Sequence, residues 1–324
     1  MSNDKDSQEK VLVTGGAGFI GSNLVDSLLS DHFKVAVFDN LGSGSYDYVK
    51  NTLGKKGFAF MQGDLLDEKT ILTAVKGFNI IWHLAANPEV RLSSVNPEIH
   101  FRQNIVATYN LLEAIRKSDV KVLGFTSTST VYGDATKIPT PEDYAPLEPI
   151  SVYGASKLAC EALVSAYANT YGFKATVCRL ANVVGSRSRH GVIYDFVQKL
   201  RNDPRTLEIL GDGEQAKSYL NIDDCIRAMR LSLEKQNRNF EIYNVGSEDQ
   251  VNVKTIAKIV IEEMGLRRIK LTFSGGFNGG RGWIGDVKIM MLDVSKLKSL
   301  GWKPKLNSAE AIRKAAKNLL KELE

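Results

Sequence analysis

A glycine-rich turn between a short apolar strand and an amphipathic helix, near the start of the chain, constrains the fold more than any other feature. Residues 11–14 are an apolar, β-branched run that predicts a buried strand. The glycine-rich segment 15–21 follows directly, and apolar residues at helical spacing continue through 24–29. Residues 34–38 predict a second strand, which ends at Asp39. Together these elements form one βαβ unit with a carboxylate at its end.

This unit predicts a binding site for a dinucleotide. The glycines permit a tight turn, so that backbone N–H groups approach a pyrophosphate, and the positive end of the helix dipole faces the same anion. Asp39 is placed to accept hydrogen bonds from the adenosine ribose hydroxyls, and its charge repels a 2′-phosphate, which favours NAD over NADP. The alternative is a glycine-rich turn without a ligand. The flanking strands and Asp39 argue against that alternative.

Apolar runs alternate with helical patterns through the rest of the first half. Strands are expected at 58–61, 80–84, 120–125 and 176–180, and helices near 67–76, 98–117 and 152–171. This alternation predicts an α/β fold with a doubly wound parallel sheet of the Rossmann type. Ligands of such sheets lie at the carboxyl ends of the strands, and there we find Asp64 after the third strand, Ala85 after the fourth and Thr128 after the fifth.

From about residue 182 the pattern loosens. We expect helices at 194–200, 253–264 and from about 308 onward, strands at 207–210 and 240–245, and a glycine-rich loop at 275–285. These elements predict a smaller C-terminal α/β domain, interleaved with the sheet domain, that binds the substrate. The predicted division assigns residues 1–181 and about 216–247 to the NAD-binding domain, and residues 182–215 and 248–324 to the substrate domain.

A tyrosine and a lysine four residues apart, Tyr153 and Lys157, form the candidate reaction centre. On a helix this spacing places both side chains on one face. An ammonium group stabilises a phenolate, so we expect the lysine to lower the tyrosine pKa from its usual value of about 10. Such a phenol can exchange a proton with a substrate hydroxyl while a hydride moves to a nicotinamide. A second Tyr-x-x-x-Lys runs from Tyr46 to Lys50 in a predicted loop, without the strand-end hydroxyl of Thr128 that accompanies the first.

Composition restricts the function classes. The net charge of +5 over 324 residues is mild, and there is no basic stripe of the kind that binds nucleic acid. No apolar run approaches the roughly 20 residues that span a bilayer. Residues 1–10 are polar, lack a signal-peptide core and predict a loose tail. Three scattered cysteines indicate a reducing, cytoplasmic setting, and no residue cluster predicts a metal site.

Motifs along nearly the whole chain resemble those of one family. They lie at 14–21, 63–65, 83–86, 104, 111–114, 127–133, 153–157, 179–185 and 300–304. On these motifs the chain resembles the extended short-chain dehydrogenase/reductase superfamily in its nucleotide-sugar epimerase/dehydratase branch, and it is most similar to the UDP-glucose 4-epimerases. The resemblance implies NAD as cofactor, a UDP-sugar as substrate and a homodimer built on the helices near 98–117 and 152–171.

The family's roles carry over to the matching positions. Together with the glycine turn, they imply cofactor contacts from Gly15, Gly18, Phe19, Ile20, Asp39, Asn40, Asp64, Leu65, Leu84, Ala85, Ala86, Asn104, Tyr153 and Lys157. They imply substrate contacts from Arg91, Thr128, Tyr153, Asn182, Lys217 and Arg281. Tyr153 is then the acid/base, Thr128 bonds the reacting sugar hydroxyl, and Lys157 holds the nicotinamide ribose. Asn104 either lies near the cofactor ribose or orders the site.

Two departures from the family pattern concern the diphosphate. Lys217 stands where relatives often have an arginine, and a lysine lacks the bidentate fork. The usual Arg-Pro-Gly-Asp is here residues 283–286, beginning with a tryptophan, and Arg281 lies two residues earlier. Four of the substrate residues also have a structural alternative: a strand-end hydroxyl for Thr128, a turn residue for Asn182, and exposed surface charge for Lys217 and Arg281.

The implied reaction is a reversible C4 epimerisation of a UDP-hexose through a 4-keto sugar, with glucose, N-acetylated and uronate forms left open. A 4,6-dehydratase is the nearest rival. In that branch Asp and Glu usually follow the catalytic threonine, where this chain has Ser129 and Thr130, so no carboxylate is placed to assist elimination. A decarboxylase or a simple reductase fits less well. A non-catalytic NAD-binding regulator is the alternative from another class, and retention of Tyr153 and Lys157 argues against it.

Overall fold

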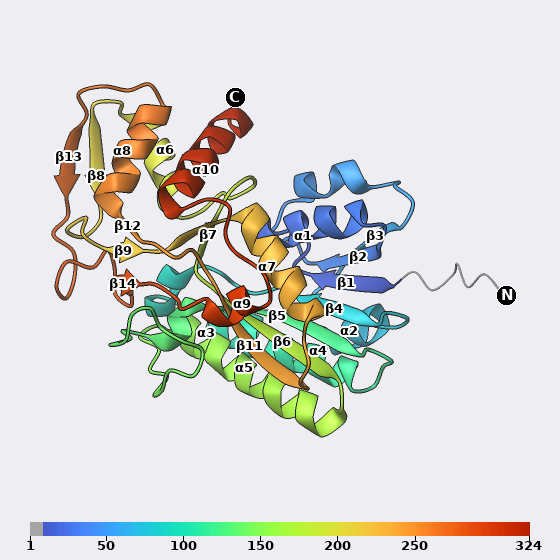
Figure 1. Cartoon of the computed structure of the whole chain (residues 1–324). Coiled ribbons are helices and arrows are strands. Elements are labelled where there is room, and N and C mark those ends of the chain that lie inside the picture. The colour runs from blue at the N-terminus through green and yellow to red at the C-terminus, as the bar shows by residue number, and fades with distance from the viewer. Residues whose placement is uncertain (1–8) are drawn as a thin grey trace.

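The computed structural model describes residues 9–324, and Figure 1 shows their arrangement. The predicted loose tail lies outside the described residues except for Glu9 and Lys10, and Lys10 already begins the first strand. In residues 9–324 no helix combines the length and the apolar character that a bilayer crossing demands.

A seven-stranded parallel sheet forms the centre of the molecule. Its strands are β1 (Lys10–Thr14), β2 (Lys34–Asp39), β3 (Phe58–Gln62), β4 (Ile80–His83), β5 (Val122–Thr128), β6 (Lys174–Leu180) and β11 (Phe240–Val245). They lie in the order β11-β6-β5-β4-β1-β2-β3, and every neighbouring pair is parallel. The strand order turns back at β1, which lies between β2 and β4, and a ligand crevice opens at such a switch point. The predicted doubly wound fold is confirmed.

Helices cover both faces of this sheet, because alternate strand residues point to opposite sides. Val11 and Val13 of β1 belong to a core with α1 (Phe19–Ser30) and α7 (Ile222–Glu234). Leu12, between them, belongs to the core on the other face. There α2 (Glu68–Ala74), α4 (Ala107–Ile115) and α5 (Val152–Tyr171) contribute the helical side. Each large apolar side chain buried in these cores contributes about 1.5–3 kcal/mol.

The helix predicted at 98–117 is not continuous. It begins as α3 (Glu98–His100), widens into a π-helical segment, η4 (Phe101–Val106), and continues as α4. Such a bulge changes the direction in which side chains leave the helix. The Asn104 side chain, inside the bulge, accepts a hydrogen bond from the Asn87 backbone N–H and donates one to the Ser156 hydroxyl. The bulge therefore joins the loop after β4 to helix α5.

The second part of the chain builds a smaller layer beside the sheet (Figure 1). Its elements are β7 (Asn182–Val184), α6 (Val192–Asn202), β8 (Thr206–Ile209), β9 (Ala216–Lys217), β10 (Tyr219–Asn221), β12 (Val251–Asn252), α8 (Val253–Glu263), β13 (Lys270–Phe273), β14 (Ile289–Met290), α9 (Ser295–Ser299) and α10 (Ser308–Glu322). Its core joins α6, α8 and α10. Three small sheets, β10-β7, β12-β9-β14 and β13-β8, complete it.

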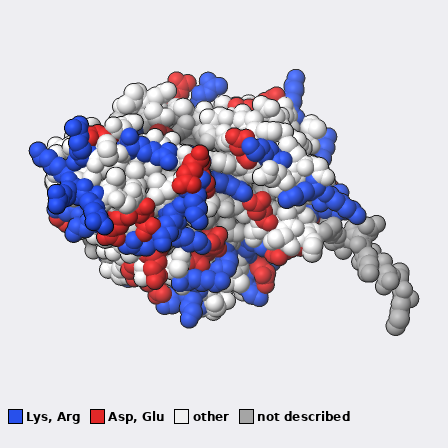
Figure 2. All heavy atoms as spheres, turned by 90° about the horizontal axis from the view of Figure 1, so that it is seen from above, with Lys and Arg blue, Asp and Glu red and all other residues white. Residues whose placement is uncertain are grey.

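The chain crosses between the two parts, since α7 and β11 return to the central sheet after β10. Helix α7 and most of the short strands were not among the predicted elements, because a two- or three-residue strand leaves no periodic signal. We propose the division of the chain given above, with 182–215 and 248–324 in the smaller part. Figure 2 shows Lys and Arg interspersed with Asp and Glu on the face that it presents.

Candidate active site

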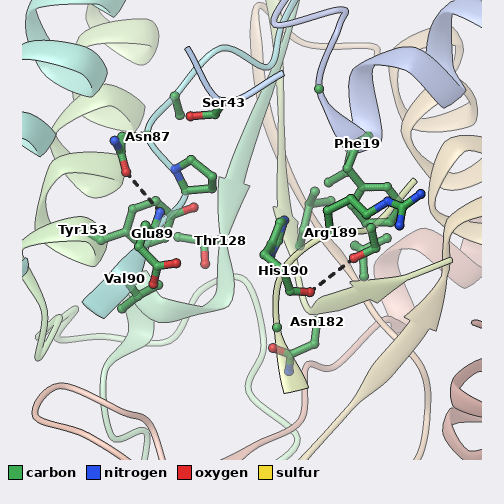
Figure 3. A pocket seen from close by; sticks show the side chains of 18 of the residues that line it. Phe19, Ser43, Asn87, Glu89, Val90, Thr128, Tyr153, Asn182, Arg189 and His190 are labelled. Atoms are coloured by element: carbon green, nitrogen blue, oxygen red, sulfur yellow. Dashed lines mark hydrogen bonds between the residues drawn. The ribbon is translucent and has the colours of Figure 1, made fainter. Parts of the chain in front are cut away.

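A cavity of about 830 Å³ lies at the carboxyl ends of the sheet strands, where the smaller part of the chain faces them. It is lined by residues that follow β1, β2, β3 and β4, by the end of β5 and by the first turns of α5. The segment between β7 and α6, Lys217 and Trp283 complete the lining. Figure 3 shows Tyr153 and Thr128 on one side of this cavity and Phe19, Arg189 and His190 on the other.

The glycine turn after β1 is shaped for close approach of a ligand to the backbone. Gly15 has φ +71°, and a Cβ there would lie 2.6 Å from the Ala85 backbone nitrogen. This contact is too close, so only glycine fits at this position. A Cβ at Gly21 would lie 2.1 Å from the Gly15 carbonyl oxygen. Gly18 is the N-cap of α1, and no described side chain caps this helix end. Its first-turn N–H groups are thus available to meet an anion.

Asp39 stands beside this turn at the end of β2. Its carboxylate accepts hydrogen bonds from the Ala17 N–H at 2.9 Å and the Leu41 N–H at 2.8 Å. Burial raises the pKa of Asp39, and these two N–H groups oppose the rise. Asn40 donates to the Asp64 carboxylate at 3.0 Å, so residues after β2 and β3 form one polar rim. Three features of this region are those of a dinucleotide-binding site. The glycine turn has no room for side chains, no described side chain caps the N-terminus of α1, and a carboxylate stands at the end of the next strand.

The predicted reaction centre is assembled by β5 and α5. Thr128 is the last residue of β5, and its hydroxyl accepts a hydrogen bond from the Thr130 N–H at 3.2 Å. Helix α5 begins after Ser151, whose hydroxyl caps the Gly154 N–H at 3.1 Å. This start places Tyr153 in the first helical turn, facing the cavity one turn before Lys157. The second match, at Tyr46, falls on the short helix η1 (Tyr46–Tyr48).

Burial dominates the titration of this pair. It raises the pKa of Tyr153 to about 12, against an opposing polar contact with the Thr128 side chain. Burial also lowers the pKa of Lys157 to about 8. The Lys157 ammonium lies 4.2 Å from the centroid of the Phe125 ring, a cation–π contact. The prediction that the lysine lowers the tyrosine pKa is therefore wrong for the protein alone, because loss of water raises the Tyr153 pKa by more than the contact with Thr128 lowers it.

Two contacts with neighbouring residues hold Tyr153 in place. His100, fully buried, meets it edge to face with ring centroids 5.7 Å apart. The Ser93 hydroxyl, on the short helix η3 (Val90–Ser94), accepts a hydrogen bond from the Tyr153 N–H at 3.0 Å. His83, buried in β4, bonds Thr14 and Thr108 through its two ring nitrogens. The phenol is thus carried by rigid elements.

The predicted substrate residues divide into two groups. Arg91, Asn182 and Lys217 line the cavity, as do all predicted cofactor residues except Asn104. Asn104 instead braces the wall from behind. Arg281 is not part of the cavity lining: its guanidinium makes a two-pronged ion pair with Asp134, at 2.9 and 3.0 Å, and donates to a backbone carbonyl.

The cations that do line the cavity are also paired. The Lys217 ammonium lies 2.5 Å from an Asp286 carboxylate oxygen, and the Arg91 guanidinium lies 2.9 Å from Asp195. Both stand over the Trp283 indole, at 5.4 Å and 4.9 Å from its centroid. Among the described residues the buried Trp283 Nε1 has no hydrogen-bond partner. A buried N–H without a partner is uncommon in folded proteins, and this one belongs to a residue that lines the cavity.

Several lining residues were missed by the sequence reasoning. Tyr48, Glu89 and Asp195 have no motif, and Asp195 meets Arg91 across a separation of 104 residues, so no local pattern identifies it. Arg187 and Arg189 also line the cavity, and no motif identifies them. Within residues 9–324 no group of His, Cys, Asp and Glu side chains is arranged to hold a metal ion.

The fold and the cavity define a dinucleotide-binding protein with a doubly wound sheet. Comparison with known proteins narrows this class. The model of the NAD dependent epimerase/dehydratase family matches residues 11–246. The chain is 33% identical to a UDP-glucose 4-epimerase of Mycolicibacterium smegmatis over 94% of its length and 96% of the relative's.

Solved structures agree. A crystal structure of a UDP-galactose 4-epimerase superposes with a TM-score of 0.87 at 45% identity, covering 97% of this chain and 100% of that one. A Thermus thermophilus UDP-glucose 4-epimerase in complex with NAD gives a TM-score of 0.84 at 33% identity, covering 96% and 99%. The chain belongs to the NAD-dependent epimerase/dehydratase family, among the nucleotide-sugar epimerases, and its cofactor is NAD.

Proposed function

We propose that this protein inverts C4 of a UDP-hexose reversibly, through a transient 4-keto sugar, with UDP-glucose and UDP-galactose or their N-acetyl forms as substrates. One observation carries the proposal. Tyr153, Thr128 and Lys157 converge on the same cavity into which the glycine turn and Asp39 open. Proton transfer and hydride transfer therefore have their groups at one place, which the reaction requires.

The roles follow from position. The Tyr153 oxygen takes the proton of the C4 hydroxyl, and the Thr128 hydroxyl holds that oxygen during the transfer. Lys157 binds the nicotinamide ribose through its ammonium group. When bound, NAD accepts a hydride from C4 and returns it, and its positive ring favours the phenolate. The keto sugar turns within the cavity, so that the hydride returns to its other face and Tyr153 returns the proton.

The remote part of the substrate keeps the keto sugar in place. Asn182 and Lys217 meet the diphosphate, and the Trp283 N–H donates to the nucleotide. Binding energy from groups far from C4 retains an intermediate that has no charge of its own. Contacts to the diphosphate and the base hold the nucleotide, while the sugar is left free to rotate, as this reaction requires.

The residues after Thr128 favour epimerisation over dehydration. They are Ser129 and Thr130, on the short helix η5 (Ser129–Tyr132), and hydroxyl groups do not protonate a leaving hydroxide at neutral pH. Elimination from C5 and C6 needs such a proton donor. The same segment supplies hydrogen-bonding groups around the sugar without driving water loss.

We also propose a homodimer, built on the helices at 98–117 and 152–171. Phe101, Tyr109 and Tyr171 are 55%, 44% and 50% exposed along this face. Large apolar side chains gathered on adjacent helices favour contact with a second copy. Sedimentation at micromolar concentration distinguishes a dimer of about twice 35.7 kDa from a monomer.

A panel of UDP-sugars tests the function. The purified protein with bound NAD is incubated with UDP-glucose, UDP-N-acetylglucosamine and UDP-glucuronate, and C4 inversion is followed by NMR. Conversion of a hexose or N-acetylhexose supports the proposal. Accumulation of a 4-keto-6-deoxy sugar identifies a dehydratase instead, and NAD binding without conversion of any sugar identifies a non-catalytic protein.

A further inference from the structure

We propose that Glu322, at the end of the last helix, positions Arg187 and Arg189 over the ADP half of NAD and so slows release of the cofactor. Residues 186–190, called the strap here, line the cavity between β7 and α6. The inference rests on NAD binding by this family and is independent of the sugar reaction.

The strap faces the dinucleotide side of the cavity. Its His190 ring meets the Phe19 ring edge to face at 6.3 Å, and Phe19 is the first residue of α1 after the glycine turn. Farther along α1, Asn23 donates to the Ser186 carbonyl and Asp26 pairs with the Arg187 guanidinium at 2.7 Å. The strap therefore lies along the helix whose N-terminus receives the pyrophosphate.

Tyr48, on η1 after β2, lines the same cavity as the strap. Burial raises the pKa of Tyr48, and the nearby Arg189 guanidinium lowers it. A phenol that follows β2 and a guanidinium that follows β7 are therefore close to one another at this cavity. A dinucleotide bound beneath them leaves more slowly while Glu322 holds Arg189 in place.

The strap is held from outside by α10. The Glu322 carboxylate accepts a hydrogen bond from the Arg187 N–H at 3.0 Å and lies 3.4 Å from the Arg189 guanidinium. Asn318, one turn earlier, donates to the Ser186 hydroxyl at 3.0 Å. One carboxylate on the final helix therefore fixes both arginines of the strap.

The backbone of the strap has one unusual conformation and is bordered by two glycines. Arg187 has φ +70°, in the left-handed region that non-glycine residues rarely occupy, and the Glu322 bond to its N–H holds it there. Gly185 and Gly191, at φ +155° and +85°, border the strap and permit hinge motion.

One guanidinium nitrogen of the strap has no partner within residues 9–324. Among the described residues the buried Nη1 of Arg187 has no hydrogen-bond partner, although the other end of the guanidinium is paired. An arginine that lines a cavity with an unused N–H suits a phosphate oxygen. We place that oxygen on NAD because the neighbours of the strap are α1, Phe19 and Tyr48.

The test measures NAD release from the holoenzyme. Holoprotein is mixed with an enzyme that consumes free NAD, and the loss of bound NAD is followed by chromatography of quenched samples. Glu322→Gln should release NAD about five times faster, the effect of losing one exposed charged contact together with a charge-assisted hydrogen bond. Arg189→Gln should do the same, and the double variant should add little, since both changes break one contact.

Matched controls separate this role from a structural one. Glu324→Gln, two residues beyond, changes the same charge at an exposed position and should leave release unchanged. The melting temperature of the NAD-free protein should be equal in all variants. Unchanged release in both Glu322→Gln and Arg189→Gln overturns the proposal. So does weaker UDP binding with unchanged NAD release, which would assign the strap to the sugar nucleotide.

Discussion

The two walls of the cavity hold their side chains by different means. On the sheet wall, formed by the strand ends and α5, position follows from regular structure: Thr128 ends β5 and Tyr153 occupies the first turn of a capped helix. On the far wall, formed by residues within 182–217 together with Trp283 and Asp286, position depends on ion pairs. Lys217 is held by Asp286 there.

This difference separates chemistry from recognition. A group on a capped helix keeps its geometry whether or not a ligand is present, which preorganised catalysis requires. A cation that already has a carboxylate partner binds a diphosphate only in competition with that partner. We therefore expect substitutions on the sheet wall to change turnover, and substitutions on the far wall to change affinity by smaller factors.

The largest effect is expected from Tyr153→Phe. Loss of the only atom that exchanges the C4 proton should lower kcat by about a thousandfold, within the range for general acid/base groups. Bound NAD, measured by absorbance after denaturation, should be unchanged, because the ring that packs on His100 is kept. Tyr46→Phe, in the second Tyr-x-x-x-Lys and 47% exposed, is the matched control and should have normal kcat. Comparable losses in both variants would contradict the assignment.

Lys157→Met should stabilise the NAD-free protein while impairing turnover. The folded pKa of about 8 lies below the ordinary lysine value of 10.5, so the unfolded chain binds more protons between these values. The penalty for burying the ammonium is fully present below pH 8 and disappears as the pH rises toward 10.5. The gain from the substitution should be about 3 kcal/mol at pH 7 and near zero at pH 10.5.

Urea unfolding of both proteins at pH 7, 9 and 10.5 checks this sign. Lys50→Met, an exposed substitution of the same chemistry, controls for the loss of one positive charge. A difference between wild type and Lys157→Met that stays constant with pH would show that the lysine titrates normally. If the sign is as expected, the buried charge of Lys157 lowers the stability of the folded protein. Such a residue is kept for function and not for folding.

Sequence reasoning succeeded where regular elements carry the side chain. The βαβ unit, the strand-end position of Asp39 and the helical spacing of Tyr153 and Lys157 are local patterns, and the structure has all three at the cavity. The same reasoning gave no sign of the π-helical segment that contains Asn104, a residue that is not part of the cavity lining. A bulge of one extra residue depends on packing between helices and not on local propensity.

Ion pairs between residues far apart in the chain could not be predicted from the sequence either. Arg281 has a sequence position that suits a diphosphate clamp, but it meets Asp134 across 147 residues. The depressed pKa predicted for Tyr153 was wrong for a related reason, since burial is a property of the assembled fold. Local spacing identifies which residues face a site, and it does not report which partners they already have.

Lys217→Gln should weaken binding of the UDP-sugar by about tenfold in KM while kcat changes little, as expected for loss of one charged contact made equally in ground and transition states. Lys217 lines the cavity, and a phosphate that binds there competes with Asp286 for its ammonium group. Steady-state kinetics with one sugar over a range of concentrations measures both constants. A fall in kcat with unchanged KM would move this residue into the chemistry of the sheet wall.

The smallest effect is expected from Arg281→Gln, which tests whether the far wall rearranges when substrate binds. With its guanidinium held by Asp134 outside the cavity lining, the residue should alter KM by less than about twofold and unfolding free energy by about 0.5 kcal/mol, typical of an exposed ion pair. Asp134→Asn breaks the same pair from the other side and should match it in stability. If Arg281→Gln instead raises KM by about tenfold while Asp134→Asn lowers it, the guanidinium leaves Asp134 for the diphosphate. The ion pairs of the far wall would then be a resting arrangement that the substrate replaces.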